Sequence, residues 1–291
     1  MSLKPVTIQQ KSRAMFQLIR PELPAAAGIC VVVGQAIALG KLPSISSVGL
    51  GFLLGFFLSG SAMIFNDYFD LEVDRINAPQ RPLPAGLLTP SEALVFGGVT
   101  AVIALVLALI VHPIAFSVCL VAWLLGFLYN WKLKAAGLWG NLIVSANVAT
   151  TFIIGGISVV GGAATPMVWT FAAIAFIFDL AEEIAGDAMD MAGDQKRSSK
   201  SLAILYGKQT ALRISALLFA LVILFSFLPV RWGETGLSYL IPISIMDVLI
   251  LFFVYRLLKS LNPQAGRAAM RAIYISATLG LLAFILGTFI R

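Results

Sequence analysis

The stretch FNDYFDLEVDR, residues 65–75, places three aspartates at the end of a long apolar run. Asp67, Asp70 and Asp74 are spaced by three and then four residues, so on an α-helix they share one face. Glu72 lies about 200° from Asp70 around the same helix, so it is expected to be a solvated neighbour. The stretch therefore predicts an acidic helix face at the end of a membrane-length segment.

The same spacing recurs in FDLAEEIAGDAMDMAGDQKR, residues 178–197, where each aspartate of the triplet lies 120 residues after its counterpart. Ten of the fourteen acidic residues fall in these two windows, which scattered surface charge would not produce. Two bare sets of carboxylates would repel each other, whereas Mg²⁺ binds such oxygens and keeps positions for water and phosphate. The pattern predicts a magnesium site that binds a phosphate ester, most simply a diphosphate. The second triplet is Asp187, Asp190 and Asp194.

Composition makes the 291-residue chain a polytopic membrane protein, because 59% of its residues are hydrophobic and only 12% are charged. Ordinary globular chains have roughly 45–50% and about 25%. A bilayer core needs about 20 apolar residues per helix, and we predict an all-α fold with nine spans. The 120-residue offset suggests two four-helix units followed by a ninth helix. The predicted spans are 21–39, 46–65, 91–111, 114–129, 138–160, 165–186, 210–229, 235–258 and 269–290.

Basic residues predict the orientation of the chain. With nine spans, 17 of the 20 lysines and arginines fall on the side of the N-terminus. The positive-inside rule then places the N-terminus and both acidic windows at the cytoplasmic face of the cell membrane. The net charge of +6 is therefore read as topology rather than as a nucleic-acid-binding surface, and no nucleic-acid partner is expected.

Basic side chains near the acids are candidates for binding a diphosphate, whose charge two metals do not fully cover and which must be stabilised as it leaves. For each of them, a role in topology is the competing interpretation. Arg13 and Arg20, near the N-terminus, are candidates for an anionic lipid, either an acceptor's phosphate or a headgroup. The basic diphosphate candidates are Arg75, Arg81, Lys132 and Lys196, with Arg197 beside them, and Asn66 and Tyr129 are candidates for the same role.

These motifs resemble those of the UbiA family of intramembrane prenyltransferases, which carry N-D-x-x-D-x-x-x-D and D-x-x-D-x-x-x-D on the second and sixth of nine helices. Asn66 completes the first motif here, and RINAPQRPLPAG, YNWKLK and GDQKRSSKSLAILYG extend the match. The span pattern covers the whole chain, so we expect one domain over residues 1–291. The resemblance implies Mg²⁺-dependent transfer of a prenyl group, with two Mg²⁺ ions expected. It also implies roles for Tyr129, Phe65, Tyr68 and Phe69 beside the allylic cation, for which packing is the alternative.

Branches of the family differ in the acceptor that receives the prenyl group, and the sequence can be compared with each branch. NDYFDLEVDRINAPQRPLPAG is similar to both the archaeal ether-lipid branch and the chlorophyll synthase branch. The second motif is most similar to the ether-lipid branch, which alkylates the hydroxyl of geranylgeranylglyceryl phosphate. Glu183 shares a face with Asp187 and would be an extra metal ligand or the proton acceptor. An aromatic acceptor, as in quinone synthesis, or a chlorophyll precursor is the alternative, although NAPQRP lacks the R-T pair usual in the quinone branch.

Two other classes of membrane protein compete with this interpretation. A divalent-cation or phosphate-ester transporter would need acids near the middle of the bilayer, and only Asp179 and Asp247 are expected to lie that deep. A CDP-alcohol phosphotransferase would need a D-G-x-x-A-R run, which the chain lacks. The expected partners are therefore a prenyl diphosphate donor, a lipid or aromatic acceptor, and the surrounding membrane lipids.

Overall fold

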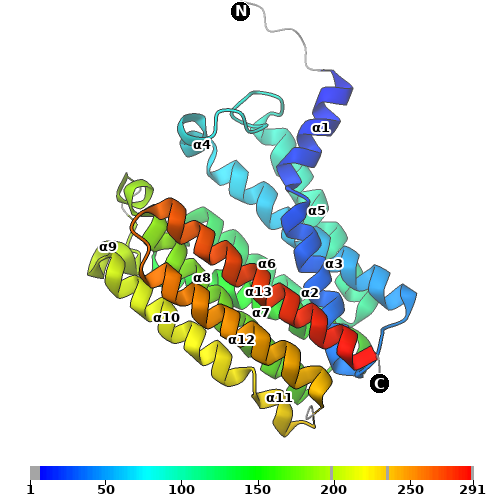
Figure 1. Cartoon of the computed structure of the whole chain (residues 1–291). Helices are drawn as coiled ribbons and strands as arrows, with labels where there is room; N and C mark the ends of the chain where they lie inside the picture. Colours follow the sequence, from blue (N-terminus) through cyan, green and yellow to red (C-terminus); the bar gives the residue numbers. More distant parts are fainter. Residues whose placement is uncertain (1–6, 197–198, 234–235, 290–291) are drawn as a thin grey trace, which may run out of the picture.

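Long helices make up most of the chain in the computed structural model (Figure 1), which describes residues 7–196, 199–233 and 236–289. Within these ranges, the side chains of residues 77, 192–196 and 286–289 are not described. Every regular element of the described residues is helical, as the apolar composition predicts. The long helices are α2 (Glu22–Leu39), α3 (Ile45–Phe69), α5 (Pro90–Val111), α6 (Pro113–Leu128), α7 (Leu138–Val160), α8 (Pro166–Lys196), α10 (Lys208–Phe225), α12 (Leu237–Leu258) and α13 (Pro263–Phe289).

Short elements connect or extend these helices. The amphipathic helix α1 (Ile8–Ile19) precedes α2, and its N-terminus is closed by a capping box between Thr7 and Gln10. A π-helical turn, η1 (Tyr129–Leu133), extends α6. The remaining short helices are α4 (Leu71–Asn77), α9 (Leu202–Tyr206) and α11 (Leu228–Arg231).

Eight helices of the described chain are long and apolar enough to cross a membrane, which confirms a polytopic membrane protein. The ninth long helix, α8, has 31 residues, but Asp179, Glu182 and Glu183 interrupt its apolar run. Each predicted span falls on one of the nine helices. The prediction of 165–186 ends too early, because the helix continues through the acidic motif to Lys196.

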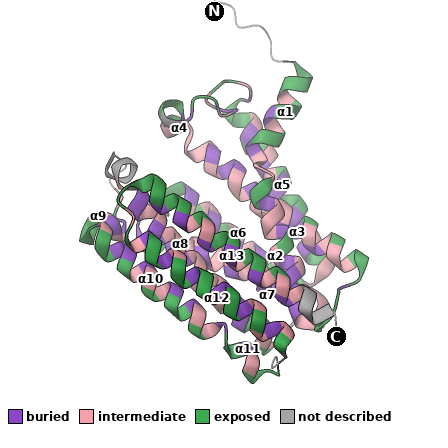
Figure 2. Ribbon diagram, viewed as in Figure 1, coloured by how far each residue is buried: buried purple, intermediate pink, exposed green. Residues whose placement is uncertain are grey.

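The helices pack in a series in which α2 contacts both α3 and α7, α3 contacts α5, and α7 leads through α8 and α10 to α12 and α13. The largest buried apolar cluster lies among α7, α8, α10, α12 and α13 and includes Phe219, Tyr239 and Ile250. Figure 2 shows exposed residues along the outward faces of α10 and α12. These faces carry large apolar side chains such as Leu217, Leu221 and Ile245, as expected where lipid replaces water around a helix bundle.

Two ends of the bundle matter for the site. We call the acid end the one at which α3 reaches Phe69 and α8 reaches Lys196, and the far end the one at which α2 reaches Leu39 and α8 begins at Pro166. Figure 1 shows α9 and the start of α13 at one end of the bundle and α11 with the C-terminus at the other. The helices α2, α8 and α13 each run between these two ends.

Glycines allow α2 to approach its neighbours closely. A Cβ atom at Gly28 would lie 2.6 Å from the carbonyl oxygen of Phe52 on α3, and one at Gly155 on α7 would lie 3.0 Å from the Cα of Gly34. Real Cβ atoms essentially never show the first distance, and the second is tighter than nearly all real Cβ contacts. Small residues at such crossings are the usual means by which membrane helices gain packing contacts.

We predict that Gly28→Leu destabilises the protein in detergent, because it forces α2 and α3 apart. Overpacking a tight contact costs about 1–3 kcal/mol. The measurement is the temperature at which half of the protein is lost from the monodisperse peak on size-exclusion chromatography. Gly98→Leu on α5 is the matched control, because a Cβ at this helical glycine meets nothing within 4 Å. An equal loss for both variants would contradict the packing assigned to Gly28.

Candidate functional site

The first acidic motif straddles a break between two helices. Asp67 lies in α3, Asp70 caps it with φ −85° and ψ 2°, and Asp74 lies in α4. Hydrogen bonds still link the two helices, since the Asp70 N–H donates to the Asn66 carbonyl at 3.0 Å and the Asp74 N–H donates to the Asp70 carbonyl at 2.8 Å. The three carboxyl groups therefore stay together, although one continuous helix does not carry them.

Burial separates the aspartates of this motif from their acidic neighbour. Asp67 and Asp74 are only 2% and 4% exposed. The side chain of Glu72 is 79% exposed and pairs with that of Arg75 at 2.7 Å. The expectation that Glu72 is a solvated neighbour is confirmed, and Arg75 lies with it on the outer side of α4 rather than against the aspartates.

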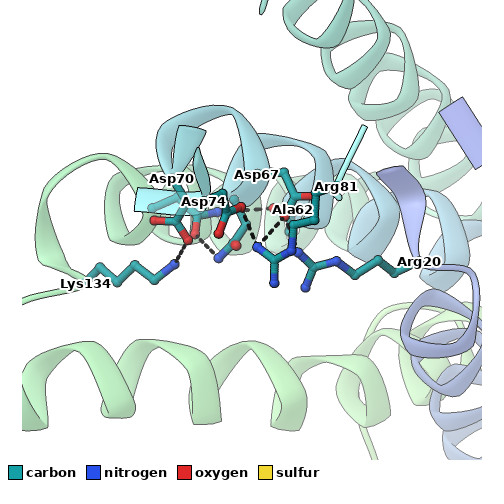
Figure 3. Close-up of polar contacts among 9 residues, drawn as sticks. Arg20, Ala62, Asp67, Asp70, Asp74, Arg81 and Lys134 are labelled. Carbon is teal, nitrogen blue, oxygen red and sulfur yellow. Dashed lines mark hydrogen bonds and ion pairs between the residues drawn. The ribbon is translucent and has the colours of Figure 1, made fainter. Parts of the chain in front are cut away.

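Three cations cover the aspartates, and each comes from a different part of the chain (Figure 3). Arg20 pairs with Asp67, and Lys134 pairs with Asp70. Arg81 pairs with Asp74 and also lies 3.6 Å from Asp67. Figure 3 shows Lys134 reaching the cluster from the side opposite to Arg20. A diphosphate that metal ions hold at the aspartates would therefore lie within reach of these same cations.

Arg20 reaches Asp67 through an unusual backbone conformation. It follows α1 with φ 52° and ψ 66°, and it is the one non-glycine residue with positive φ in the described chain. A left-handed conformation costs an L-residue roughly 1–2 kcal/mol. An ion pair between Lys11 and Glu92 ties α1 to α5, so the direction from which Arg20 enters the site is set by the packing of α1.

Lys134, and not Lys132, is the lysine of YNWKLK that faces the acids. Lys134 lies four residues after Asn130, so the two share a face of the helix, and Asn130 faces the first motif. Lys132 instead lies over the ring of Trp131, 4.1 Å from its centroid. Sequence analysis proposed Lys132 for diphosphate contact, and in the structure the lysine of this stretch beside the first motif is Lys134.

A pair of asparagines joins η1 to the first motif. The Asn66 amide nitrogen donates to Asn130 Oδ1 at 3.1 Å, and the Asn130 amide donates to the carbonyl of Ala62 at 3.2 Å. With its amide in the opposite orientation, Asn66 would donate to Asp70 at 3.2 Å and accept from Lys134 at 3.1 Å. In this second orientation, Asn66 would bridge the Asp70–Lys134 pair.

The second acidic motif has its own polar partners on the neighbouring helices. The amide of Asn141 on α7 donates to Asp187 Oδ2 at 2.9 Å. Arg267, near the start of α13, pairs with Asp190, and both side chains are 52% exposed. Asp194 and Lys196 lie on the last turn of α8, but their side chains are outside the described residues, as is Arg197.

Further acids continue along α8 below this motif. Glu183 lies one turn before Asp187 and is half-buried, as are Glu182 and Asp179. Ser145 on α7 lies 2.8 Å from Asp179 Oδ2 through its hydroxyl oxygen, and 2.9 Å from the carbonyl of Asn141. The hydroxyl has one proton, so it donates to one of these two oxygens at a time. By rotating, it can donate to an ionised Asp179, or accept from a protonated Asp179 while it donates to the carbonyl.

The aromatic residues near the first motif pack against α6. Phe65 contacts Trp123 and Phe127, and Phe69 contacts Phe127. Tyr68 contacts Phe69. The ring of Tyr129 lies against the start of α7, where a Cβ at Gly140 would be 3.0 Å from it. These contacts support the packing interpretation of the rings.

The donor set at the acid end suits a hard cation such as Mg²⁺. The candidate ligands are carboxylate oxygens, with asparagine amides beside them, and Mg²⁺ is bound by one or two carboxylates together with substrate phosphates. No three histidine, cysteine, aspartate or glutamate side chains converge as a preformed metal site within the described residues. The carboxylates of the first motif are instead directed at Arg20, Arg81 and Lys134. The site therefore fits an ion that arrives with its own phosphate ligands.

Several residues of this arrangement were missed by sequence reasoning. Lys134 and Asn130 lie beside predicted candidates and are four residues apart, a spacing that places both on one helix face. Asn141 and Arg267 come from α7 and α13, and their sequence surroundings carry no signal. Arg20 was considered for an anionic lipid, whereas the structure pairs it with Asp67.

Comparison with known proteins identifies the family of the chain. Residues 27–278 match the UbiA prenyltransferase family. The chain is 33% identical over 279 residues, 96% of its length, to digeranylgeranylglyceryl phosphate synthase of Thermococcus kodakarensis, of which 99% is covered. The enzyme of the same name from Thermococcus sibiricus is 35% identical over 276 residues, 95% of this chain and 97% of that one.

Solved structures show the same fold. One from a study of digeranylgeranylglyceryl phosphate synthase in membranes has a TM-score of 0.82 and 31% identity, and covers 97% of this chain and 100% of its own. A UbiA homologue from Archaeoglobus fulgidus bound to GPP and Mg²⁺ has a TM-score of 0.69, with 19% identity over 94% of this chain and 99% of that one. The chain therefore belongs to the UbiA prenyltransferase family.

Proposed function

We propose that this protein transfers a geranylgeranyl group from its diphosphate to the free hydroxyl of geranylgeranylglyceryl phosphate, forming the second ether bond of an archaeal-type lipid. The observation that carries the proposal is that Arg20, Arg81 and Lys134 form ion pairs with the first set of aspartates. Their positive charges complement the negative charge of a metal-bound diphosphate. The choice of acceptor is supported by the relatives of about a third identity, which are named digeranylgeranylglyceryl phosphate synthase.

Two Mg²⁺ ions are proposed, one at each acidic motif. Asp67, Asp70 and Asp74 would hold the first, and Asp187, Asp190 and Asp194 the second. The bound ions supply Lewis-acid stabilisation of the leaving diphosphate. Support comes from the matched spacing of the two motifs, and Mg²⁺ is present in the related structure that holds GPP.

The side chains of the chain itself perform the remaining tasks. Arg20, Arg81 and Lys134 donate hydrogen bonds to diphosphate oxygens as the allylic C–O bond breaks. The apolar bundle keeps water away from the allylic cation, so that the acceptor oxygen forms the new C–O bond. The acceptor hydroxyl loses its proton in this step, and Glu183, half-buried one turn from Asp187, is the proposed acceptor of that proton.

We also propose nine spans, with α8 as the sixth, arranged as two four-helix units and a ninth helix. The acid end would face the cytoplasm, as would the N-terminus. The proposal is supported by the 120-residue offset between the motifs and by the excess of basic residues on that side. The donor, the acceptor and the surrounding lipids would then all reach one domain, formed by residues 1–291.

An acceptor panel tests the proposed reaction. Purified protein with Mg²⁺ and labelled geranylgeranyl diphosphate is expected to release diphosphate and form a labelled ether when geranylgeranylglyceryl phosphate is present. Transfer to 4-hydroxybenzoate with none to geranylgeranylglyceryl phosphate would contradict the acceptor. Passage of Mg²⁺ across sealed vesicles without transfer to any acceptor would favour a transporter.

We predict that Asp67→Asn and Asp190→Asn each lower kcat/KM for the donor by about a hundredfold or more, because a bound metal contributes several kcal/mol to the transition state. The amide keeps the shape of the side chain and removes its charge. Glu72→Gln is the matched control from the same stretch, since Glu72 is exposed and pairs with Arg75. Retention of full activity in Asp67→Asn or Asp190→Asn would show that the metal sites are misassigned.

We predict that Lys134→Met lowers kcat/KM by about tenfold to a hundredfold, because a hydrogen bond to a charged group is worth roughly 1.5–3 kcal/mol. Lys132→Met removes the same charge two residues away and is expected to change kcat/KM by less than about twofold, as is usual for an exposed charge. Steady-state kinetics with the same donor measures both. A larger loss for Lys132→Met than for Lys134→Met would contradict the assignment of Lys134 to the diphosphate.

A further inference from the structure

Arg267 is a cation of the acid end that the first motif does not engage. Arg20, Arg81 and Lys134 all pair with aspartates of the first motif. Arg267, the fifth residue of α13, pairs instead with Asp190 of the second motif. It therefore lies beside the other motif, and the steps proposed above give it no task.

Helix packing holds Arg267 at this place. Asn262 caps the start of α13, where its Oδ1 accepts a hydrogen bond from the N–H of Ala265 at 2.8 Å. The buried Gly266 faces Met189 of α8, since a Cβ at this glycine would meet the Met189 sulfur. The side chain of Arg267 therefore extends from a backbone that is packed directly against the second motif.

The pair of Arg267 with Asp190 is open to ligands. Both side chains are 52% exposed, and an ion pair at this exposure adds little to stability. Asp190 is also proposed above as a metal ligand, and a guanidinium beside a bound cation needs another anion as its partner. Arg267 is therefore available to bind an anionic group of a substrate.

The proposed reaction brings two anionic groups to the site. The diphosphate of the donor is assigned to Arg20, Arg81 and Lys134, which pair with the first motif. The phosphate of geranylgeranylglyceryl phosphate needs a partner of its own. A guanidinium donates paired hydrogen bonds to phosphate oxygens, so Arg267 has the chemistry that this second group requires.

Spacing along α8 fits this assignment. Glu183, the proposed acceptor of the hydroxyl proton, lies seven residues before Asp190, which places both on one face about 10 Å apart. In the acceptor, the free hydroxyl and the phosphate lie on one glycerol unit, so their oxygens are within roughly 6 Å. Hydrogen bonds of about 3 Å at either end bring the span to roughly 12 Å. A hydroxyl at Glu183 therefore places its phosphate within reach of Arg267.

We infer that Arg267 binds the phosphate of the acceptor and thereby selects an acceptor that carries one. The inference rests on the proposed function, since it assigns a second group of the same reaction. Arg20, which the sequence suggested for an acceptor phosphate, is engaged by Asp67 in the structure. The two arginines thus serve different substrates, Arg20 the donor and Arg267 the acceptor.

The test compares geranylgeranylglyceryl phosphate with geranylgeranylglycerol, which lacks the phosphate, as acceptors in the full-length protein with Mg²⁺ and geranylgeranyl diphosphate. Arg267→Met is expected to raise KM for the phosphorylated acceptor by about tenfold to a hundredfold, as is usual for a lost hydrogen bond to a charged group. KM for the donor and kcat/KM for geranylgeranylglycerol are expected to stay unchanged. Calorimetric titration of the phosphorylated acceptor without donor is expected to show a Kd raised by the same factor.

Two further variants separate binding from folding. Arg267→Lys keeps the charge and is expected to restore part of the affinity for the phosphorylated acceptor. Arg256→Met removes an exposed arginine from the last turn of α12, at the same end of the bundle. It is the matched control, and KM for donor and acceptor is expected to stay unchanged.

Three results would overturn the inference while leaving the proposed function intact. Equal losses with both acceptors would show that Arg267 only positions the second motif. A raised KM for the donor with an unchanged KM for the acceptor would assign Arg267 to the diphosphate. Unchanged affinity of Arg267→Met for the phosphorylated acceptor would leave Arg267 without a ligand. If the unaltered protein transferred the prenyl group to neither acceptor, the proposed function itself would fail.

Discussion

Ion pairing between buried aspartates and three distant cations is the interaction on which the acid end depends. Asp67 and Asp74 are almost fully buried, and a buried carboxylate without a partner costs several kcal/mol. Arg20, from the α1–α2 junction, and Arg81, from the segment after α4, reach these two residues. Lys134, at the end of η1, reaches Asp70. These ion pairs therefore hold together elements that share little direct packing. A ligand that competes for the cations would break the pairs.

The distribution of charge along α8 gives the site its second property. On this helix, which covers about 30 Å from Asp187 to Met167, the acids Glu183, Glu182 and Asp179 follow the second motif toward the far end. Asp179 is hydrogen-bonded to Ser145 on α7. Beyond Asp179 the helix has no charged side chain as far as Pro166, so its charge is confined to the half nearer the acid end.

Periodic features of this protein could be predicted from the sequence, because they are local. The three-then-four spacing of the aspartates identified both motifs, and apolar runs located each long helix. The contacts of single cations were not predicted. Lys134 reaches Asp70 from the position four residues after Asn130, and Arg20 reaches Asp67 through a left-handed backbone conformation. Asn141 and Arg267 are placed by the packing of α7 and α13 against α8, which no spacing along the chain encodes.

We propose that the oxygens of a metal-bound diphosphate replace the aspartates as the partners of Arg20, Arg81 and Lys134. Calorimetric titration with a non-hydrolysable thio analogue of geranylgeranyl diphosphate tests it directly. The account predicts strong binding only when Mg²⁺ is present, and a tighter apparent Mg²⁺ affinity when the analogue is present, since linkage between two ligands is reciprocal. Equally tight binding of the analogue in the presence of a chelator would contradict the claim.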